Sequence, residues 1–199
     1  MANAIALDIE TDTSPLTDKE KAAGYTSRGL DPAITAVTAV SMYDGTDSHV
    51  LSGEERSLLI DLADWLRTSD ADTVLTWNGS AFDFPFLDAR MGLPGIQTPW
   101  TLVHNPDIPV KYEPTPGYLG GYDVRGLGAN HVDVALLTRE RTGRWCSLKM
   151  HARSEYGLDP VEVDRTKMHL LTGKQLREYV VSDAVTTYEI ARRMGLLTA

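Results

Sequence analysis

The first strand that the sequence predicts carries charged groups close to its apolar positions. In the stretch IALDIETDT, Ile5, Leu7 and Ile9 alternate as they would on one buried face of a β-strand. Residues i and i+2 point to the same side of a strand, so Asp8 and Glu10 present two carboxylates together. A buried charge is costly unless something compensates it. The role of these two carboxylates therefore limits the classes of protein to which the chain can belong.

The two acids have three possible interpretations. An EF-hand calcium loop that starts at Asp8 would need glycine at its sixth position and glutamate at its twelfth, but the sequence has Thr13 and Lys19 there. That interpretation is excluded. A solvated edge strand with its polar face outward is the second. The third is a site for Mg²⁺ or Mn²⁺, which prefer hard oxygen ligands and would need further acids from elsewhere in the chain.

The composition limits the class of protein. A length of 199 residues predicts a single domain, residues 1–199, with a sizeable core. Cys146 is the only cysteine, which excludes an internal disulfide and a zinc–cysteine cluster. No apolar run approaches the ~20 residues of a membrane span, and the N-terminus lacks a signal-peptide pattern. We therefore expect a cytoplasmic protein with no membrane partner.

The net charge narrows the choice of nucleic-acid partners. It is −9, which counts against sequence-specific binding of duplex DNA. It does not exclude an enzyme that holds a few nucleotides through bound cations. A clustered acidic site would itself account for part of the negative charge.

The order of the predicted elements indicates an α/β domain with a mixed central β-sheet flanked by helices. A long polar insertion follows the first strand, at residues 11–33. Residues 93–130 are rich in Pro and Gly and are expected to be irregular, with short strands as an open alternative. The predicted strands are residues 4–10, 33–45, 49–53 and 72–79, and the predicted helices are residues 54–69, 80–92, 131–140, 147–157 and 173–195.

The segment WNGSAFDFPFL supplies a further acid. Asn78 ends a predicted strand, and Asp83 lies just inside the following helix. Ser80 and Asp83 also fit a capping box, so a purely structural role is open. Phe82 or Trp77 is a candidate to line a slot in which a nucleobase stacks.

The last predicted helix carries two further candidate site residues. Tyr179 and Asp183 are four residues apart and therefore share one face of that helix. For an isolated Y-x-x-x-D, a surface acid that pairs with Lys174 or Arg177 is the commoner interpretation of Asp183. Taken alone, neither this segment nor the previous one establishes a site.

Taken in order, these segments resemble one family. D-x-E on the first strand, N-x(3)-F-D after a later strand and Y-x(3)-D on a C-terminal helix are similar to the three motifs of DEDD-type 3′–5′ exonucleases, and Tyr179 indicates the DEDDy branch. LDIET and WNGSAFDFPFL are most similar to the exonuclease domain of family-B DNA polymerases and its stand-alone relatives. The resemblance implies a ribonuclease H-like fold with the catalytic carboxylates Asp8, Glu10, Asp83 and Asp183.

The resemblance also implies two divalent ions. Four converging carboxylates repel one another, and two cations ~3.5–4 Å apart can neutralise them. One ion, Mg²⁺ or Mn²⁺, would lie among Asp8, Glu10 and Asp183 and hold the attacking water. The second would be held by Asp8, with Asp83 nearby, and stabilise the leaving 3′-oxygen. Tyr179 would orient the water, because a phenol with a pKa of about 10 is a poor base near neutrality.

The expected activity follows from this resemblance. It implies a metal-dependent 3′–5′ exonuclease that hydrolyses single-stranded DNA to nucleoside 5′-monophosphates. An exoribonuclease of the same fold and an inactive nucleic-acid-binding domain are the alternatives. The sequence shows no polymerase domain, so we expect no proofreading within the same chain, although a separate polymerase or repair protein is a candidate partner. Expected substrate contacts are Thr11, Asn78, Phe82 and Lys149, the last with a solvated helix lysine as the alternative.

Other polar residues have no expected catalytic part. Asp133 in HVDV is interpreted as structural or as a helix cap. His104, His131, His151 and His169 show no spacing typical of a zinc site, so each is expected to be an ordinary surface or packing residue.

The insertion at residues 11–33 has two open interpretations. It carries Lys19, Lys21 and Arg28 in an otherwise acidic protein. It could be a mobile flap that brings positive charge to the substrate groove, or a solvated segment without a role.

Overall fold

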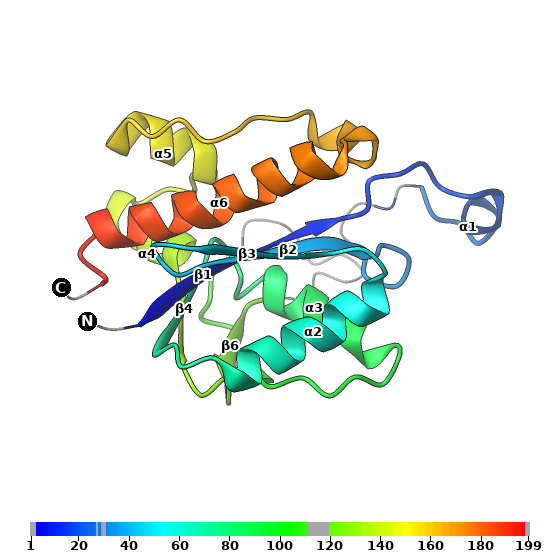
Figure 1. The fold of residues 1–199 in the computed structure, drawn as a ribbon, viewed down its shortest axis with the longest axis horizontal. Helices are drawn as coiled ribbons and strands as arrows, with labels where there is room; N and C mark the ends of the chain where they lie inside the picture. Colours follow the sequence, from blue (N-terminus) through cyan, green and yellow to red (C-terminus); the bar gives the residue numbers. More distant parts are fainter. Residues whose placement is uncertain (1–2, 27, 29–30, 111–119, 198–199) are drawn as a thin grey trace.

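The computed structural model of the chain describes residues 3–26, 28, 31–110 and 120–197. These residues form three layers, with a central mixed sheet between two layers of helices (Figure 1). The expected α/β class is therefore confirmed. None of the helices formed by these residues combines the length and the apolar composition that a membrane-spanning helix needs.

The central sheet contains five strands in the order β3–β2–β1–β4–β7. Strand β1 is antiparallel to β2 and parallel to β4, and β4 is parallel to β7. The carboxyl ends of β1, β4 and β7 therefore meet at one edge, where open α/β sheets commonly bind ligands. The strands are β1 Ala4–Thr11, β2 Val37–Tyr43, β3 Ser48–Ser52, β4 Thr73–Thr76 and β7 Asn130–Asp133.

Helices cover both faces of the sheet. Helices α2 and α3 lie on one face, and α4, α5 and the long α6 lie on the other (Figure 1). The helices are α1 Asp18–Ala22, α2 Glu55–Thr68, α3 Asp83–Gly92, α4 Val134–Thr142, α5 Leu148–Tyr156 and α6 Gly173–Arg193, with a 3₁₀ helix, η1, at Arg165–Leu170.

The two faces of β1 differ in the size of their side chains. Ile5, Leu7 and Ile9 pack into the core beneath α2 and α3. Ala4 and Ala6 point the other way, into a second core beneath α4, α5 and α6. Small side chains let α6 approach the sheet closely. By the same alternation, Asp8 and Glu10 face the α6 side of β1.

Three helix termini show how local chemistry sets the elements. Helix α5 follows an N-cap at Ser147, whose hydroxyl accepts a hydrogen bond from the Met150 N–H. Helix α6 begins with a capping box between Thr172 and Gln175. Pro85 lies in the first turn of α3, where a missing N–H costs little.

Several predicted boundaries differ from the structure. The strand predicted at residues 33–45 begins only at Val37, and the helix predicted at residues 80–92 begins only at Asp83. The sequence predicts one helix at residues 131–140, but the first residues of this range belong to β7, and α4 begins only at Val134. His131 and Val132 are drawn into the sheet by their parallel pairing with β4. The strand predicted at residues 72–79 ends at Thr76.

The segment at residues 93–130 contains the short strands β5, Thr101–His104, and β6, Tyr122–Arg125. The two strands pair antiparallel as a separate sheet beside the main one. Residues 111–119 of this predicted irregular stretch lie outside the described residues.

The 11–33 insertion projects from the body of the molecule and carries α1 (Figure 1). Arg28 is not a free cation there. Its Nη atoms lie 3.3 Å from Asp12 Oδ2 and 3.0 Å from Glu20 Oε2, and it donates a hydrogen bond to the Ile34 carbonyl at 2.8 Å. Arg28 thus makes its contacts within the insertion and its base, and the choice between a flap and a segment without a role stays a prediction. Residues 27, 29 and 30 of the insertion lie outside the described residues.

Candidate active site

Three carboxylates converge at the carboxyl end of β1. Asp8 and Glu10 come from β1 and Asp183 comes from α6, and one oxygen of each lies within 4.8 Å of the others. They meet because α6 crosses the alanine-lined face of β1. Asp8 Oδ2 is buried and has no hydrogen-bond partner among the described residues. A buried, unpartnered carboxylate oxygen needs a ligand or a proton.

Asp83 reaches the same groove from the start of α3 and is almost fully buried. The capping-box interpretation of Ser80 and Asp83 is wrong, because the N-cap of α3 is Phe82 and makes no side-chain cap hydrogen bond. The Asp83 carboxylate is therefore not used to begin its helix. It lies outside the cluster of three but close enough for its charge to act on Asp8.

Burial and mutual repulsion raise the pKa of these acids. The pKa of Asp8 is well above its usual value because of burial, and because of the charges of Glu10, Asp183 and Asp83. Burial, with the charge of Asp183, raises the pKa of Glu10 to about 8. Burial, with the charge of Asp133, raises the pKa of Asp83 to about 7. A divalent cation would relieve this repulsion, and the all-oxygen donor set fits Mg²⁺ or Mn²⁺.

Tyr179 is buried beside the carboxylates. Arg165 Nε donates a hydrogen bond to its hydroxyl at 3.2 Å. Burial, together with the charges of Glu10 and Asp183, raises the pKa of the Tyr179 phenol above its usual range. The phenol is therefore neutral at any physiological pH.

Lys149 was expected either to contact the substrate or to be a solvated helix lysine, and the structure places it in neither position. It is neither solvated nor part of the groove lining, and only 6% of it is exposed. Its Nζ lies 3.0 Å from Asp183 Oδ1, donates a hydrogen bond to the Val161 carbonyl at 2.6 Å, and sits 3.8 Å above the centre of the Tyr179 ring. A direct contact with a phosphate would require Lys149 to leave these internal partners. Burial raises the pKa of Asp183, although Lys149 opposes the shift.

Asp133 holds the loop between β4 and α3 in place. Its carboxylate accepts hydrogen bonds from the N–H groups of Asn78 and Ser80, both at 3.0 Å. It also caps α4 by accepting from Ala135 and Leu136, so the interpretation as a structural helix cap is confirmed. Asn78 has φ of 72°, in the left-handed region that non-glycine residues rarely adopt. The hydrogen bond that the Asn78 N–H donates to Asp133 helps to hold this conformation.

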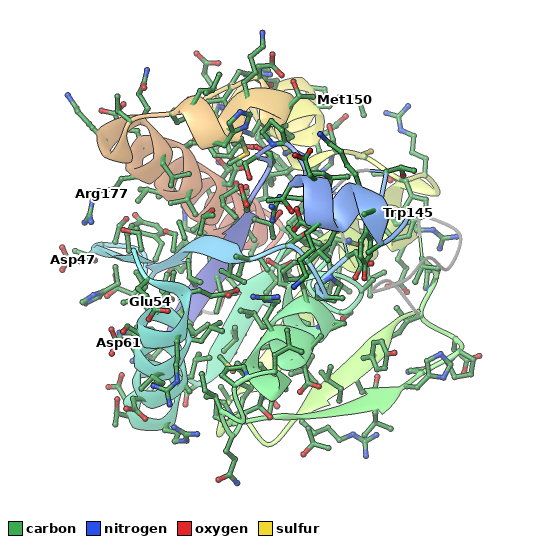
Figure 2. The ribbon with its side chains drawn as sticks, turned by 90° about the vertical axis from the view of Figure 1, so that its right-hand side faces the viewer. Asp47, Glu54, Asp61, Trp145, Met150 and Arg177 are labelled. Carbon is green, nitrogen blue, oxygen red and sulfur yellow. The ribbon has the colours of Figure 1, made fainter. Side chains whose placement is uncertain are left out.

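The carboxylates lie in a groove of about 370 Å³. The expected substrate residues Thr11, Asn78 and Phe82 line it, and Asn78 Oδ1 is buried without a hydrogen-bond partner in the described part of the chain. Two indole rings also line the groove, from Trp77 and Trp145. Figure 2 shows Trp145 on the opposite side of the view from the acidic residues Asp47, Glu54 and Asp61.

Sequence reasoning missed part of the groove lining, notably Arg165, Trp145 and Met168. Each comes from a connection or from η1, and none forms part of a motif with fixed spacing. No local signal in the sequence identifies them, because their place in the groove depends on how η1 and the α4–α5 connection pack.

Two of the histidines have the packing contacts that were expected of them. The ring of the buried His131 lies 2.8 Å from the Thr76 hydroxyl, and burial lowers its pKa to about 4. His151 packs beside Trp77 and Tyr156. Within the described residues, the cluster that could hold a metal is made of acids alone.

The sequence is similar to one protein family and to a DNA polymerase subunit. Residues 3–99 match the family model described as DNA polymerase family B, exonuclease domain. The sequence is 27% identical over 205 residues to the catalytic subunit of DNA polymerase epsilon from Eremothecium gossypii, covering 92% of this chain and 9% of that protein.

Among solved structures, the family B DNA polymerase from the hyperthermophilic archaeon Pyrobaculum calidifontis matches with a TM-score of 0.69 and 18% identity, over 98% of this chain and 24% of that one. This likeness confirms the expected ribonuclease H-like α/β fold. The chain spans only a small part of both polymerases.

Proposed function

We propose that this chain, which carries a domain like the exonuclease domain of family-B DNA polymerases, is a metal-dependent 3′–5′ exonuclease that acts on single-stranded DNA. One observation carries the proposal. The groove brings Asp8, Glu10, Asp83 and Asp183 together from three separate segments, with Tyr179 behind them. Four acids are expensive to assemble at one buried place, so a function that uses them is the simplest reason for the arrangement.

The acids fit a pair of divalent cations. Asp8, Glu10 and Asp183 would hold one Mg²⁺ or Mn²⁺ ion, and Asp8 with Asp83 would hold the second. When bound, such ions would neutralise the carboxylates and stabilise the attacking and leaving oxygens of a phosphodiester.

The remaining residues would position the reactants. Tyr179, kept neutral by burial, can hold a water molecule by a hydrogen bond but cannot take its proton. Asn78 offers a buried acceptor oxygen to the groove, and Phe82 and Trp77 offer aromatic surface to a nucleobase. Each turnover would release a nucleoside 5′-monophosphate.

The test is the digestion of a 5′-end-labelled single strand with Mg²⁺ or Mn²⁺. A ladder that shortens from the 3′ end, and that EDTA abolishes, is the expected result. Asp8→Asn should nearly abolish it, because Asp8 is assigned to both ions. Asp61→Asn removes an exposed acid of α2 and should leave the rate unchanged. Undiminished hydrolysis by folded Asp8→Asn protein would overturn the proposal.

Matched DNA and RNA strands in the same assay decide the substrate class. Faster digestion of RNA would make the enzyme an exoribonuclease. If the labelled strand stays intact with every metal ion tested, the chain is a binding domain without nuclease activity. Because the curated relative is the catalytic subunit of a polymerase, we propose a separate polymerase or another replication or repair protein as a partner.

A further inference from the structure

Arg165 is a cation in the acidic groove that no motif predicted. It begins η1, whose N-cap Asp164 accepts a hydrogen bond from Thr166 rather than from Arg165. The Arg165 side chain lines the same groove as Asp8, Glu10 and Asp183. Its charge acts on Glu10 and Asp183, which lie close by.

The guanidinium of Arg165 has N–H donors that its hydrogen bond to Tyr179 does not use. Arginine offers five N–H groups in one rigid plane. The Nε group donates to the Tyr179 hydroxyl at 3.2 Å. Among the described residues, the two Nη atoms have no hydrogen bond and no carboxylate within 4.0 Å. Lys149, by contrast, has its ammonium against Asp183 and the Val161 carbonyl.

The chemistry that such donors suit is a phosphate. Arginine pairs with phosphate oxygens in a bidentate geometry that a lysine cannot copy. An acidic groove repels a nucleic-acid backbone, so a cation with open donors at the groove is where a phosphate would be held.

We propose that Arg165 bridges the substrate and Tyr179, with its Nη atoms on the non-bridging oxygens of the terminal phosphodiester and its Nε on the tyrosine hydroxyl. The bridge fixes the position of the phenol relative to the phosphorus. This inference rests on the proposed nuclease function. Arg165 therefore acts both as a binding residue and, through Tyr179, as a positioning residue.

A binding cycle tests the phosphate contact without any hydrolysis. In EDTA, the affinity of wild-type protein and Arg165→Ala is measured for short oligothymidylate, with the terminal linkage either natural or an uncharged methylphosphonate. Arg165→Ala should weaken binding of the natural strand by about tenfold, the scale of a charge-assisted hydrogen bond. It should leave binding of the methylphosphonate strand within about twofold of wild type.

The matched control is Lys167→Ala. It removes one positive charge from the same 3₁₀ helix, but Lys167 is exposed and pairs with Asp164. For Lys167→Ala, the ratio of the affinity for the natural strand to the affinity for the methylphosphonate strand should stay at its wild-type value. Arg165→Lys is the second variant, because it keeps a charge and a long stem if the alanine variant folds poorly. It should recover part of the binding but not the cleavage rate.

Single-turnover cleavage at saturating Mn²⁺ tests the link to Tyr179. If Nε positions the phenol, Arg165→Ala should slow cleavage much less in a Tyr179→Phe background than in wild type. Equal losses in both backgrounds, or equal weakening of both strands in the binding cycle, would overturn the inference while a wild-type ladder upholds the nuclease function. A wild-type protein that neither binds nor cleaves either strand would overturn both.

Discussion

At the scale of single residues, burial decides what Tyr179 can do. A phenol in water is already a weak base near neutrality. Here burial and the charges of Glu10 and Asp183 raise its pKa further. Its hydroxyl can then only hold a partner in place, which agrees with its hydrogen bond from Arg165.

Tyr179→Phe keeps the ring and its packing but removes the hydroxyl. We expect a partial loss of single-turnover rate, on the order of 10²-fold, the lower end of what positioned proton-transfer groups contribute. Asp183→Asn should cost considerably more, because it removes one of the three clustered carboxylates.

Asp183→Asn also leaves Lys149 buried without its ion-pair partner, so each variant's thermal midpoint must be measured beside its rate. The rates are compared only between fully folded proteins at saturating metal. If Tyr179→Phe is as inactive as Asp183→Asn, the positioning role is wrong. If it is fully active, Tyr179 only packs.

At the scale of elements, one carboxylate joins three segments. Asp133 ends β7, caps α4 and binds two N–H groups of the loop between β4 and α3. That loop carries Asn78 and leads directly to Asp83. The position of a candidate metal ligand therefore depends on an acid that lies on another strand.

Asp133→Ala should destabilise the protein by about 2–4 kcal/mol, since it removes a helix cap and leaves buried N–H groups unpaired. It should also lower the cleavage rate, because Asp83 loses its support. Glu54→Ala is the matched control. It removes the cap of α2, whose residues do not line the groove, and should lower stability less than Asp133→Ala does, with no change in the cleavage rate. Chemical denaturation and the ladder assay measure both effects.

Arg28 sets the conformation of the 11–33 insertion. We expect Arg28→Ala to speed proteolysis within the insertion while the thermal midpoint of the whole protein changes little, because its contacts stay within the insertion and its base. The salt dependence of single-strand binding should not change. Lys21→Ala, which breaks an exposed ion pair with Asp18, serves as the control. A flatter salt dependence in Arg28→Ala alone would support the flap hypothesis instead.

At the scale of the whole molecule, the acidic cluster should make the stability of the fold depend on pH. The folded-state pKa of Glu10 is about 8 and that of Asp83 about 7, whereas the ordinary values are 4.5 and 3.8. Between the ordinary and the folded value, the folded protein holds more protons than the unfolded chain. Its stability must therefore fall as the pH rises through that interval.

The cleanest window for this effect is pH 6.5 to 8. Below it, His131 acts in the opposite direction, since burial lowers its pKa from 6.5 to about 4. In EDTA, the thermal midpoint should fall from pH 6.5 to pH 8, and Glu10→Gln should flatten the fall. Mg²⁺ or Mn²⁺ should restore the midpoint most at pH 8, where the carboxylates are ionised. A midpoint that does not depend on metal at pH 8 would contradict the assignment of the cluster.

Those parts of the site whose geometry is local could be predicted from the sequence. Alternation along a strand puts Asp8 and Glu10 on one side, and a separation of four residues puts Tyr179 and Asp183 on one face of a helix. The order of the elements, with their apolar periodicity, also predicted the α/β class and the mixed sheet. These features depend only on the regular backbone geometry within a single strand or helix.

Other parts of the site follow from long-range packing. The segment Asn130–Asp133 is too short to show a periodicity of its own, and its parallel pairing with β4 makes it strand β7. Lys149 is buried because α5 packs on α6 and brings it to Asp183. Arg165 enters the groove because η1 packs beside Tyr179. Each of these outcomes depends on contacts between residues far apart in the chain, which no local pattern encodes.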